Sequence, residues 1–217
     1  MTELIVKAVI AYLLGSIIGS LVIGRLRGST DIRTLGSGNA GATNALRTQG
    51  KAVGLAVLLI DLAKGWVATA WLAPATLPVV FPAGPALEVW AVPLCGLAVM
   101  VGHVYPLFFG FRGGKGVATF VGVILGISGS LFLVMVVAFL VAVIIFGYVS
   151  LGSMLAAIAV AVAVAVGDYT PRAPLLSFAI LAALLIVFTH RSNIARLASG
   201  SESRARRLWL FGLKRNA

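Results

Sequence analysis

Long apolar runs separated by short polar segments dominate the pattern along this chain. Runs of about 18 residues or more are long enough to cross the hydrocarbon core of a bilayer as helices. The short alternating segments typical of outer-membrane barrels are missing from the sequence. The pattern therefore predicts an all-α integral membrane protein with about seven transmembrane helices, at residues 4–24, 52–73, 87–108, 114–128, 130–148, 150–166 and 174–190.

The number of spans depends on the middle of the chain. The fourth predicted span is short, so it needs either tilt or shielding by its neighbours. Only Ser128, Gly129 and Ser130 separate it from the fifth. Counts of five or six spans therefore stay open as alternatives.

Two apolar segments that could be interpreted otherwise are expected to be helical spans. The first segment lacks the basic start of a signal peptide and is expected to be retained, with Gly15 and Gly19 suited to close helix packing. Alanine and valine alternate at 156–167, but a helix that satisfies its own backbone hydrogen bonds is favoured there. Because no repeat or soluble second domain is visible, residues 1–217 are interpreted as a single domain.

Composition supports a membrane location. The chain is 60% hydrophobic and only 11% charged, which is too few charges to cover the surface of a soluble domain. The net charge of +11 would suit nucleic acid, anionic lipid or anionic substrates, but the apolar spans argue against a nucleic-acid binder. The single cysteine, Cys95, allows no intrachain disulfide, and no residue cluster predicts a metal site.

The distribution of basic residues predicts the orientation. With the N-terminus outside, Lys7 and Arg172 face one side and Lys64 lies within a span, so the other 14 of the 17 Lys and Arg residues share the opposite side. The positive-inside rule then puts that side, and the C-terminus, in the cytoplasm. The basic tail at 191–217 is expected to lie on the membrane surface, anchored by Trp209 and Phe211.

Three polar segments carry the candidate chemistry, and all three fall on the predicted cytoplasmic side. In the first, residues 24–47, glycines interleave with hydroxyl and amide side chains, and a short helix is expected to start near Asn39 or Ala40. Such a segment offers backbone and side-chain donors to phosphate, although a solvated loop is the simpler alternative. Its candidate residues are Ser37, Asn39, Thr43, Asn44 and Arg47.

The second segment, residues 102–119, opens the fourth predicted span. It combines flexible glycine backbone, a helix N-terminus and the ammonium group of Lys115. The spacing is not that of a P-loop, and an ordinary turn between helices is the alternative interpretation. The candidate phosphate-binding residues are Gly113, Gly114, Lys115 and Gly116.

The third segment, residues 190–202, puts His190, Asn193 and Arg196 on one helix face, because they are spaced three apart. Basic residues that satisfy a helix end and lipid headgroups are the alternative interpretation. His190 and His103, the only histidines, both adjoin polar glycine-rich segments.

Two opposite charges lie inside the second span. Asp61 and Lys64 are one helical turn apart, and charges in hydrocarbon usually face a bundle interior or a wet cavity. An internal ion pair that braces the site is favoured. Direct contact between Lys64 and a substrate is the alternative.

The three segments, in this order between spans, resemble the bacterial acyl-phosphate:glycerol-3-phosphate acyltransferase family. The resemblance runs from residue 15 to about 202 and rests on GSGNAGATNALR, GHVYPLFFGFRGGKGVAT and HRSNIARLASGSE, with DLAKG in the second span. It implies a seven-helix enzyme of the bacterial cytoplasmic (inner) membrane. Such an enzyme moves an acyl group from acyl phosphate to the 1-hydroxyl of glycerol 3-phosphate and yields lysophosphatidic acid and phosphate, the first acylation of phospholipid synthesis.

The resemblance also implies roles for individual residues. Ser37 and Arg47 match an essential serine and arginine, and Glu202 matches a structural glutamate. The glycines at 113, 114 and 116 match the glycerol 3-phosphate loop, and His190 with Asn193 matches an important pair. No cofactor is implied. The partners implied are glycerol 3-phosphate, acyl phosphate, membrane lipid and an enzyme that supplies acyl phosphate.

Several functional alternatives remain at this point. Either His190 or a substrate phosphate oxygen is the general base, and a covalent acyl-Ser37 is less attractive because the donor is already activated. An organic-phosphate transporter is the alternative function, since the buried charges and glycine breaks suit one. Soluble-type glycerolipid acyltransferases and CDP-alcohol phosphotransferases are disfavoured, since their His-x4-Asp and aspartate-rich motifs are missing.

Overall fold

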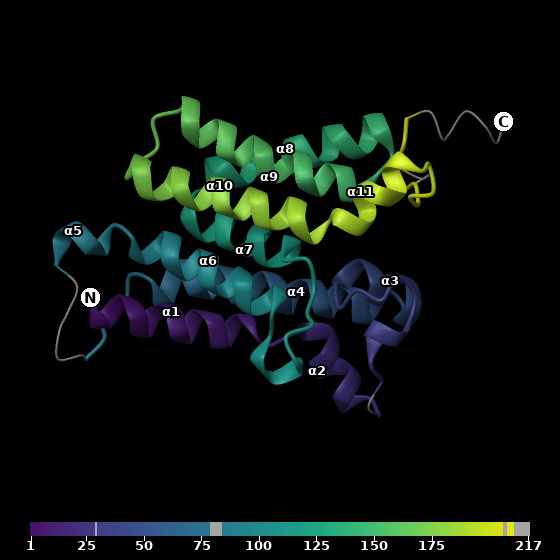
Figure 1. Cartoon of the computed structure of the whole chain (residues 1–217), viewed down its shortest axis with the longest axis horizontal. Coiled ribbons are helices and arrows are strands. Elements are labelled where there is room, and N and C mark those ends of the chain that lie inside the picture. The colour runs from purple at the N-terminus through teal and green to yellow at the C-terminus, as the bar shows by residue number, and fades with distance from the viewer. Residues whose placement is uncertain (29, 79–83, 206–207, 211–217) are drawn as a thin grey trace. The chain divides into compact units, whose positions relative to one another are not determined.

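Helices make up all the regular secondary structure in the part of the chain that the computed structural model describes, namely residues 1–28, 30–78, 84–205 and 208–210 (Figure 1). The chain divides into two compact units, Met1–Ser128 and Gly129–Ala217. The division falls at Ser128, the weak boundary between the fourth and fifth predicted spans. The fourth and fifth predicted spans are therefore separate helices.

Unit 1 starts with a broken helix. Helices α1 (Thr2–Gly15) and α2 (Gly19–Leu26) are bent by 49° at the break between them. The end of unit 1 away from the N-terminus gathers α2, α3 and the connection that follows α6 (Figure 1). The other elements are η1 (Ile32–Thr34), α3 (Ala42–Gln49), α4 (Lys51–Val67), η2 (Ala68–Leu72), α5 (Pro85–Glu88), α6 (Ala91–Val104), η3 (Leu107–Phe109) and α7 (Val117–Ile127).

The described residues of unit 2 form three long helices and a short one. Helices α8 (Gly129–Phe146) and α10 (Arg172–Thr189) both pack against α9 (Val149–Val166), and α11 (Arg191–Ala198) follows. The alternating alanine and valine residues belong to α9, so the helical prediction for this run is confirmed. Large apolar side chains stay exposed along α8, including Leu133 and Val137, as expected for a lipid-facing surface.

Five helical segments of the described residues are long and apolar enough to cross a membrane, and the α1–α2 pair makes six if it counts as one bent span. The predicted fourth span is the 11-residue helix α7, which reaches only about 16 Å at 1.5 Å per residue. This length is short of a hydrocarbon core of roughly 30 Å. A multi-pass, all-helical architecture is therefore present, whereas the count of seven spans stays a prediction.

The described part of the basic tail packs on unit 2. Trp209 donates from Nε1 to the carbonyl of Ile145, and Arg204 stacks over the Trp209 ring at 4.1 Å. Trp209 thus contacts the end of α8, and its role as an anchor at the membrane surface stays a prediction. Residues 206–207 and 211–217, which include Phe211, lie outside the described residues.

Glycines allow the helices of unit 1 to approach each other closely. A Cβ atom at Gly122 of α7 would lie 1.9 Å from the carbonyl oxygen of Leu62, and one at Gly15 would lie 2.2 Å from that of Val99. Small residues permit such backbone contacts in membranes. Gly15 and Gly19 do serve close packing, but the helix break separates them, so Gly15 packs on α6 and Gly19 on α4.

A buried ion pair lies near the start of α1. Lys7 Nζ is 3.1 Å from Glu3 Oε1 and donates to the carbonyl of Ala73 at 2.9 Å. The sequence pattern treats Lys7 as a charge on the outer side, whereas the structure buries the side chains of both residues. The i, i+4 spacing on α1 brings the pair together, and packing of the chain around it removes water.

We expect Gly122→Ala to destabilise the protein by about 1–3 kcal/mol, because the added methyl group must push α4 and α7 apart. Thermal denaturation of the purified protein in detergent measures the effect. Gly129→Ala is the control, since a Cβ atom at Gly129 meets nothing within 4 Å. Equal melting temperatures for the two variants would show that close α4–α7 contact is not needed.

Candidate active site

The first polar segment forms a loop between α2 and α3 that Asn44 holds together. Asn44 Oδ1 accepts a hydrogen bond from the Ser37 N–H at 3.0 Å. Its Nδ2 lies 2.9–3.2 Å from the carbonyl oxygens of Ile32, Leu35 and Asn39. Because these backbone groups occupy its amide, we assign Asn44 to shaping the loop rather than to the direct phosphate contact that the sequence suggested.

The loop presents Ser37 to solvent at a sharp turn. Gly36 and Gly38, on either side of it, have φ angles of +57° and +72°, which favour glycine. A Cβ atom at Gly36 would also lie 2.3 Å from Asn44 Oδ1. Helix α3 starts at Ala42, slightly later than expected. The candidate side chains that remain accessible are Ser37, Thr43 and Arg47, with Asn39 partly buried.

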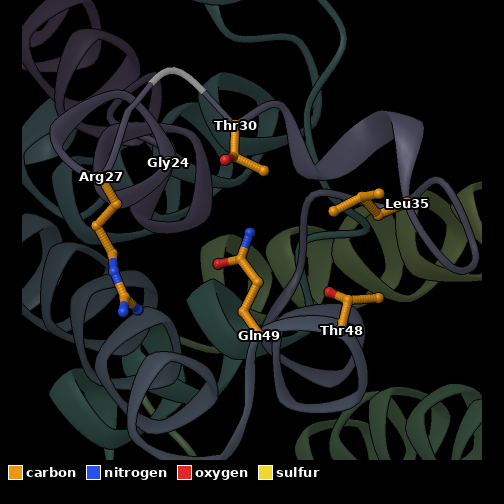
Figure 2. Close-up of a pocket in the computed structure, with 6 residues that line it drawn as sticks. All are labelled: Gly24, Arg27, Thr30, Leu35, Thr48 and Gln49. Carbon is orange, nitrogen blue, oxygen red and sulfur yellow. The ribbon is translucent and has the colours of Figure 1, made fainter.

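A pocket of about 340 Å³ opens between the end of α2 and the end of α3. Figure 2 shows Gln49 projecting between Arg27 on one side and Thr48 on the other. Gln49 follows Arg47 by two residues, so it points about 200° away around the helix. The pocket therefore uses the side of α3 that is turned away from Arg47. None of its lining residues is among the candidates that the sequence pattern indicates; they are Gly24, Arg27, Thr30, Leu35, Thr48 and Gln49.

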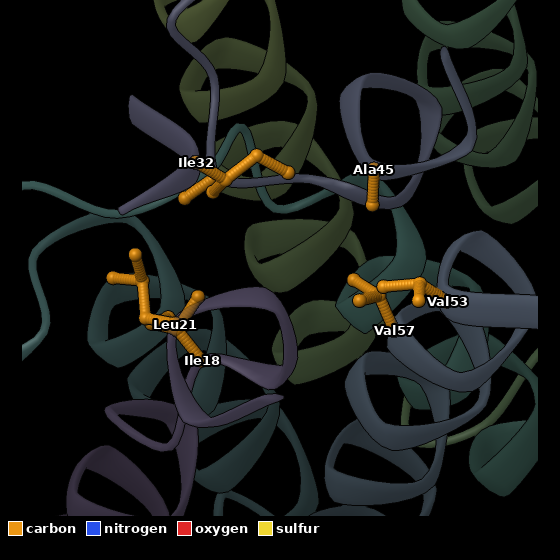
Figure 3. Close-up of a cluster of buried hydrophobic side chains, with 7 residues drawn as sticks. Ile18, Leu21, Ile32, Ala45, Val53 and Val57 are labelled. Atoms are coloured by element: carbon orange, nitrogen blue, oxygen red, sulfur yellow. The ribbon is translucent and has the colours of Figure 1, made fainter. Parts of the chain in front are cut away.

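An apolar cluster fastens this loop to the spans. In Figure 3, Ile18 of the α1–α2 break and Leu21 of α2 face Ile32 of the loop, while Ala45 of α3 faces Val53 and Val57 of α4. All six side chains are at most 6% exposed, so the loop is anchored although most of its polar side chains are accessible. Burial of these apolar groups thus gives a glycine-rich segment a defined position.

Arg33 joins the first polar segment to the second. Its guanidinium binds both oxygens of the Asp31 carboxylate and donates from Nη1 to the carbonyls of Phe109 and Arg112, each at 2.9 Å. The hydrogen bond from Arg33 lowers the pKa of Asp31, and Asp31 raises the pKa of Arg33. Since an arginine fork makes several fixed hydrogen bonds, Arg33 brings the two loops together. Sequence spacing gave no signal for this contact.

The glycine loop of the second segment uses part of its backbone for its own structure. The N–H groups of Gly113 and Gly114 donate to the carbonyls of Val104 and His103 at the end of α6, each at 3.1 Å. These two amides therefore donate within the protein, and the phosphate-binding role of Gly113 and Gly114 stays a prediction. Gly116, with φ +82°, caps α7, whose first-turn N–H groups follow directly after Lys115. That turn and Lys115 are the candidate phosphate donors.

The charges inside the second predicted span stabilise the break between α1 and α2. Lys64 Nζ donates to the carbonyls of Gly15 and Ile17, at 2.9 and 2.8 Å. Asp61 Oδ1 accepts from the Gly19 N–H at 3.3 Å and lies 3.0 Å from Lys64 Nζ. The ion pair thus serves backbone groups that the helix break leaves without helical partners. This geometry agrees with the bracing interpretation, not with direct substrate contact by Lys64.

In unit 2, the third polar segment fixes the proton position on His190. The ring atom Nδ1 lies 2.7 Å from the carbonyl oxygen of Ile186. A carbonyl only accepts hydrogen bonds, so Nδ1 carries the proton, and Nε2 is the basic nitrogen of the neutral ring. The side chain is 3% exposed and lies at the junction of α10 and α11.

Glu202 is the centre of a hydrogen-bond network that holds the third segment. Its Oε1 accepts from Ser150 at 2.7 Å and from Asn193 at 2.6 Å, and its Oε2 accepts from Arg196 at 2.7 Å. Burial acts to raise the pKa of Glu202, but these three hydrogen bonds and the charge of Arg196 lower it overall. The sequence indicated Asn193, Arg196 and Glu202, whereas Ser150, on α9, gave no signal.

Taken together, the helices and their polar loops define a multi-pass integral membrane protein, and comparison with known proteins gives its family. The family model described as glycerol-3-phosphate acyltransferase matches residues 5–200. The glycerol-3-phosphate acyltransferase of Chlorobaculum tepidum is 41% identical, over 90% of this chain and 94% of the relative. That of Geotalea daltonii is 43% identical, over 94% of this chain and 98% of the relative. The chain therefore belongs to the glycerol-3-phosphate acyltransferase family.

Two solved structures have the same fold. They are crystal structures of PlsY (YgiH), an integral membrane glycerol 3-phosphate acyltransferase. One is its glycerol 3-phosphate form and the other its lysophosphatidic acid form. Their TM-scores are 0.80 and 0.78, at 37% and 36% identity. Each comparison covers 93% of this chain and 94% of the solved one. The fold of a membrane acyltransferase is therefore shared over nearly the whole length.

We expect Glu202→Gln to destabilise the protein by about 1.5–3 kcal/mol, because the charge that accepts three hydrogen bonds is lost. The lowered pKa of Glu202 implies stability that is present above the ordinary carboxyl pKa and is lost as the pH falls through the folded value. Melting temperatures measured between pH 7 and pH 3 should therefore fall more steeply for the wild type than for the variant. Glu88→Gln, at an exposed position, is the control. Identical pH profiles for wild type and Glu202→Gln would contradict this role.

Proposed function

We propose that the protein transfers a fatty acyl group from acyl phosphate to the 1-hydroxyl of sn-glycerol 3-phosphate. The products are 1-acyl-sn-glycerol 3-phosphate (lysophosphatidic acid) and inorganic phosphate, and the reaction is the first acylation of phospholipid synthesis. Family membership over residues 5–200 supports an acyltransferase that acts on glycerol 3-phosphate. The similar solved structures are a glycerol 3-phosphate form and a lysophosphatidic acid form of PlsY. These two molecules are the proposed substrate and product, which supports the proposal.

The observation that carries the proposal is the contact of Arg33 with the second polar segment. This contact joins, within unit 1, the two loops that are candidates for binding phosphate. A reaction between two phosphorylated substrates requires two anion sites close together. We assign glycerol 3-phosphate to Lys115 and the first turn of α7, within the loop of Gly113, Gly114 and Gly116. The head of the acyl phosphate is assigned to the first loop, through Ser37, Asn39, Thr43 and Arg47.

Acyl phosphate suits this set of residues as the donor. It is a mixed anhydride, so phosphate leaves without activation by a cofactor, and the protein mainly aligns the hydroxyl with the carbonyl. Alignment supplies about 7–11 kcal/mol of the barrier, and each well-placed donor to developing charge adds about 2.7–4 kcal/mol. Direct transfer requires no covalent acyl-Ser37, and Ser37 instead donates a hydrogen bond.

The remaining roles concern the acceptor and the membrane. His190, with Asn193, orients the acceptor hydroxyl or takes its proton through Nε2, and a substrate phosphate oxygen is the other candidate base. We further propose a seven-span topology in the bacterial cytoplasmic membrane, in which α7 is a short span, the N-terminus is outside and the basic C-terminus is cytoplasmic. An acyl-phosphate-forming enzyme supplies the donor. Membership of an acyltransferase family removes the support for a transporter.

The function is tested with purified protein in detergent, supplied with palmitoyl phosphate and glycerol 3-phosphate. We expect stoichiometric release of phosphate and formation of lysophosphatidic acid, since an enzyme, unlike a transporter, needs no second compartment. Palmitoyl-CoA in place of palmitoyl phosphate is the donor control and should give no product. Product from palmitoyl-CoA alone would overturn the proposed donor, and no product from either donor would overturn the proposed function.

The role of His190 is tested by the pH dependence of turnover. If Nε2 takes the proton, His190→Ala should lower kcat by about 10²–10⁴-fold and remove the acidic limb of the kcat profile. Arg191→Ala, next in the chain and exposed, is the control. A variant at position 190 with near-normal turnover at every pH would leave the substrate phosphate as the base.

A further inference from the structure

His103 lies at the point where α6 ends and the glycine loop begins. Its backbone carbonyl accepts the Gly114 N–H, and a Cβ atom at Gly114 would lie only 2.2 Å from the ring atom Nε2. A Cβ atom at Gly113 would lie 2.0 Å from the His103 carbonyl oxygen. The main chain and the ring of His103 therefore both contact the glycine loop directly.

The opposite edge of the His103 ring faces the buried ion pair. Nδ1 lies 3.5 Å from Asp61 Oδ1, the oxygen that also contacts Lys64 and the Gly19 N–H. The His103 side chain is 2% exposed and Asp61 is fully buried. The imidazole is thus held between a carboxylate that serves the helix break and the backbone of the glycine loop.

This region contains buried polar atoms that have no hydrogen-bond partner. Among the described residues, the buried side-chain atoms without a hydrogen-bond partner are Asp61 Oδ2, His103 Nδ1 and Thr119 Oγ1. Thr119 lies in the first turn of α7, directly after the glycine loop, and a Cβ atom at Gly65 of α4 would lie 2.2 Å from its carbonyl oxygen. Unsatisfied buried groups are destabilising, and natural proteins keep them chiefly where function requires them.

The helix break and the segment after His103 are also tied to each other by hydrogen bonds. Ser16, in the break, accepts the Leu107 N–H through Oγ at 3.2 Å. Tyr12 donates from its hydroxyl to the carbonyl of Tyr105 at 2.8 Å. These bonds keep the segment after His103 beside the break without involving the Asp61 carboxylate.

We infer that Asp61 and His103 are positioning residues for the glycine loop, and that they set the affinity for the phosphate group of the acceptor. The inference rests on the proposed function, in which the loop and α7 hold glycerol 3-phosphate. Asp61 acts through His103 and touches no substrate. The Asp61 carboxylate lies against one edge of the ring, and the opposite edge packs on the backbone of Gly114, so the first turn of α7 and Lys115 keep their direction toward the phosphate.

The test compares two buried ion pairs of unit 1. Asp61→Asn removes the charge that faces His103, and Glu3→Gln removes the charge of the Glu3–Lys7 pair, which is equally buried but close to the start of α1. We expect Asp61→Asn to raise KM for glycerol 3-phosphate by about tenfold, with KM for palmitoyl phosphate within about twofold of wild type. Glu3→Gln should lower the melting temperature and leave both KM values within about twofold.

A second variant keeps the test decisive if Asp61→Asn does not fold. His103→Asn leaves the Asp61–Lys64 pair intact, keeps an amide group toward Asp61 and removes the ring atoms that contact Gly114. It should raise KM for glycerol 3-phosphate selectively, by a similar factor. In the double variant the effect should not exceed that of His103→Asn alone, because Asp61 acts through the ring.

The outcomes separate this inference from the proposed function. Folded His103→Asn with an unchanged KM for glycerol 3-phosphate would overturn the inference while wild-type activity stands. An equal rise in both KM values, or the same selective rise in Glu3→Gln, would also overturn it, because either result indicates general loosening of unit 1. Inactivity of the wild type with both substrates would instead overturn the proposed function.

Discussion

A helix that breaks inside a membrane must find new partners for the backbone groups that the break exposes. Ser16, Ile18 and Gly19 are buried from water, so the α1–α2 break depends on the Asp61–Lys64 ion pair. The pair supplies an ammonium group for the carbonyls on one side of the break and a carboxylate oxygen for the N–H on the other. The direction of α2, and with it the position of the first polar loop, follows from this contact.

Two further contacts turn this break into a site. The apolar cluster around Ile18 and Val57 fastens the first loop to α2 and α4, and Arg33 fastens it to the second loop. Loops rich in glycine lose much conformational freedom when they are ordered. Burial of apolar side chains and a multidentate arginine provide the compensation, so the accessible groups, Ser37 and Arg47 among them, project from a fixed backbone.

In unit 2, a carboxylate outside the predicted spans also accepts hydrogen bonds from separate segments. Glu202 gathers Ser150, Asn193 and Arg196, so the short helix α11 is held against α9 close to its start. The carbonyl of Ile186 then fixes the proton of His190 on Nδ1. The hydrogen bonds to Glu202 favour its charged form, and the carbonyl of Ile186 selects one tautomer of the neutral His190 ring.

The sequence by itself determined the membrane class, the helical architecture and the three polar segments, because hydropathy and glycine patterns are local properties. It also indicated the Asp61–Lys64 pair, since residues three apart share a helix face. Only the tertiary structure decided that Asn44, Gly113 and Gly114 direct polar groups to the backbone, and that Arg33, Ser150 and the buried Glu3–Lys7 pair matter. Their partners lie far along the chain or in the backbone of a folded loop, or their burial depends on packing by distant segments. Sequence spacing does not encode such contacts, because they exist only after the helices have packed.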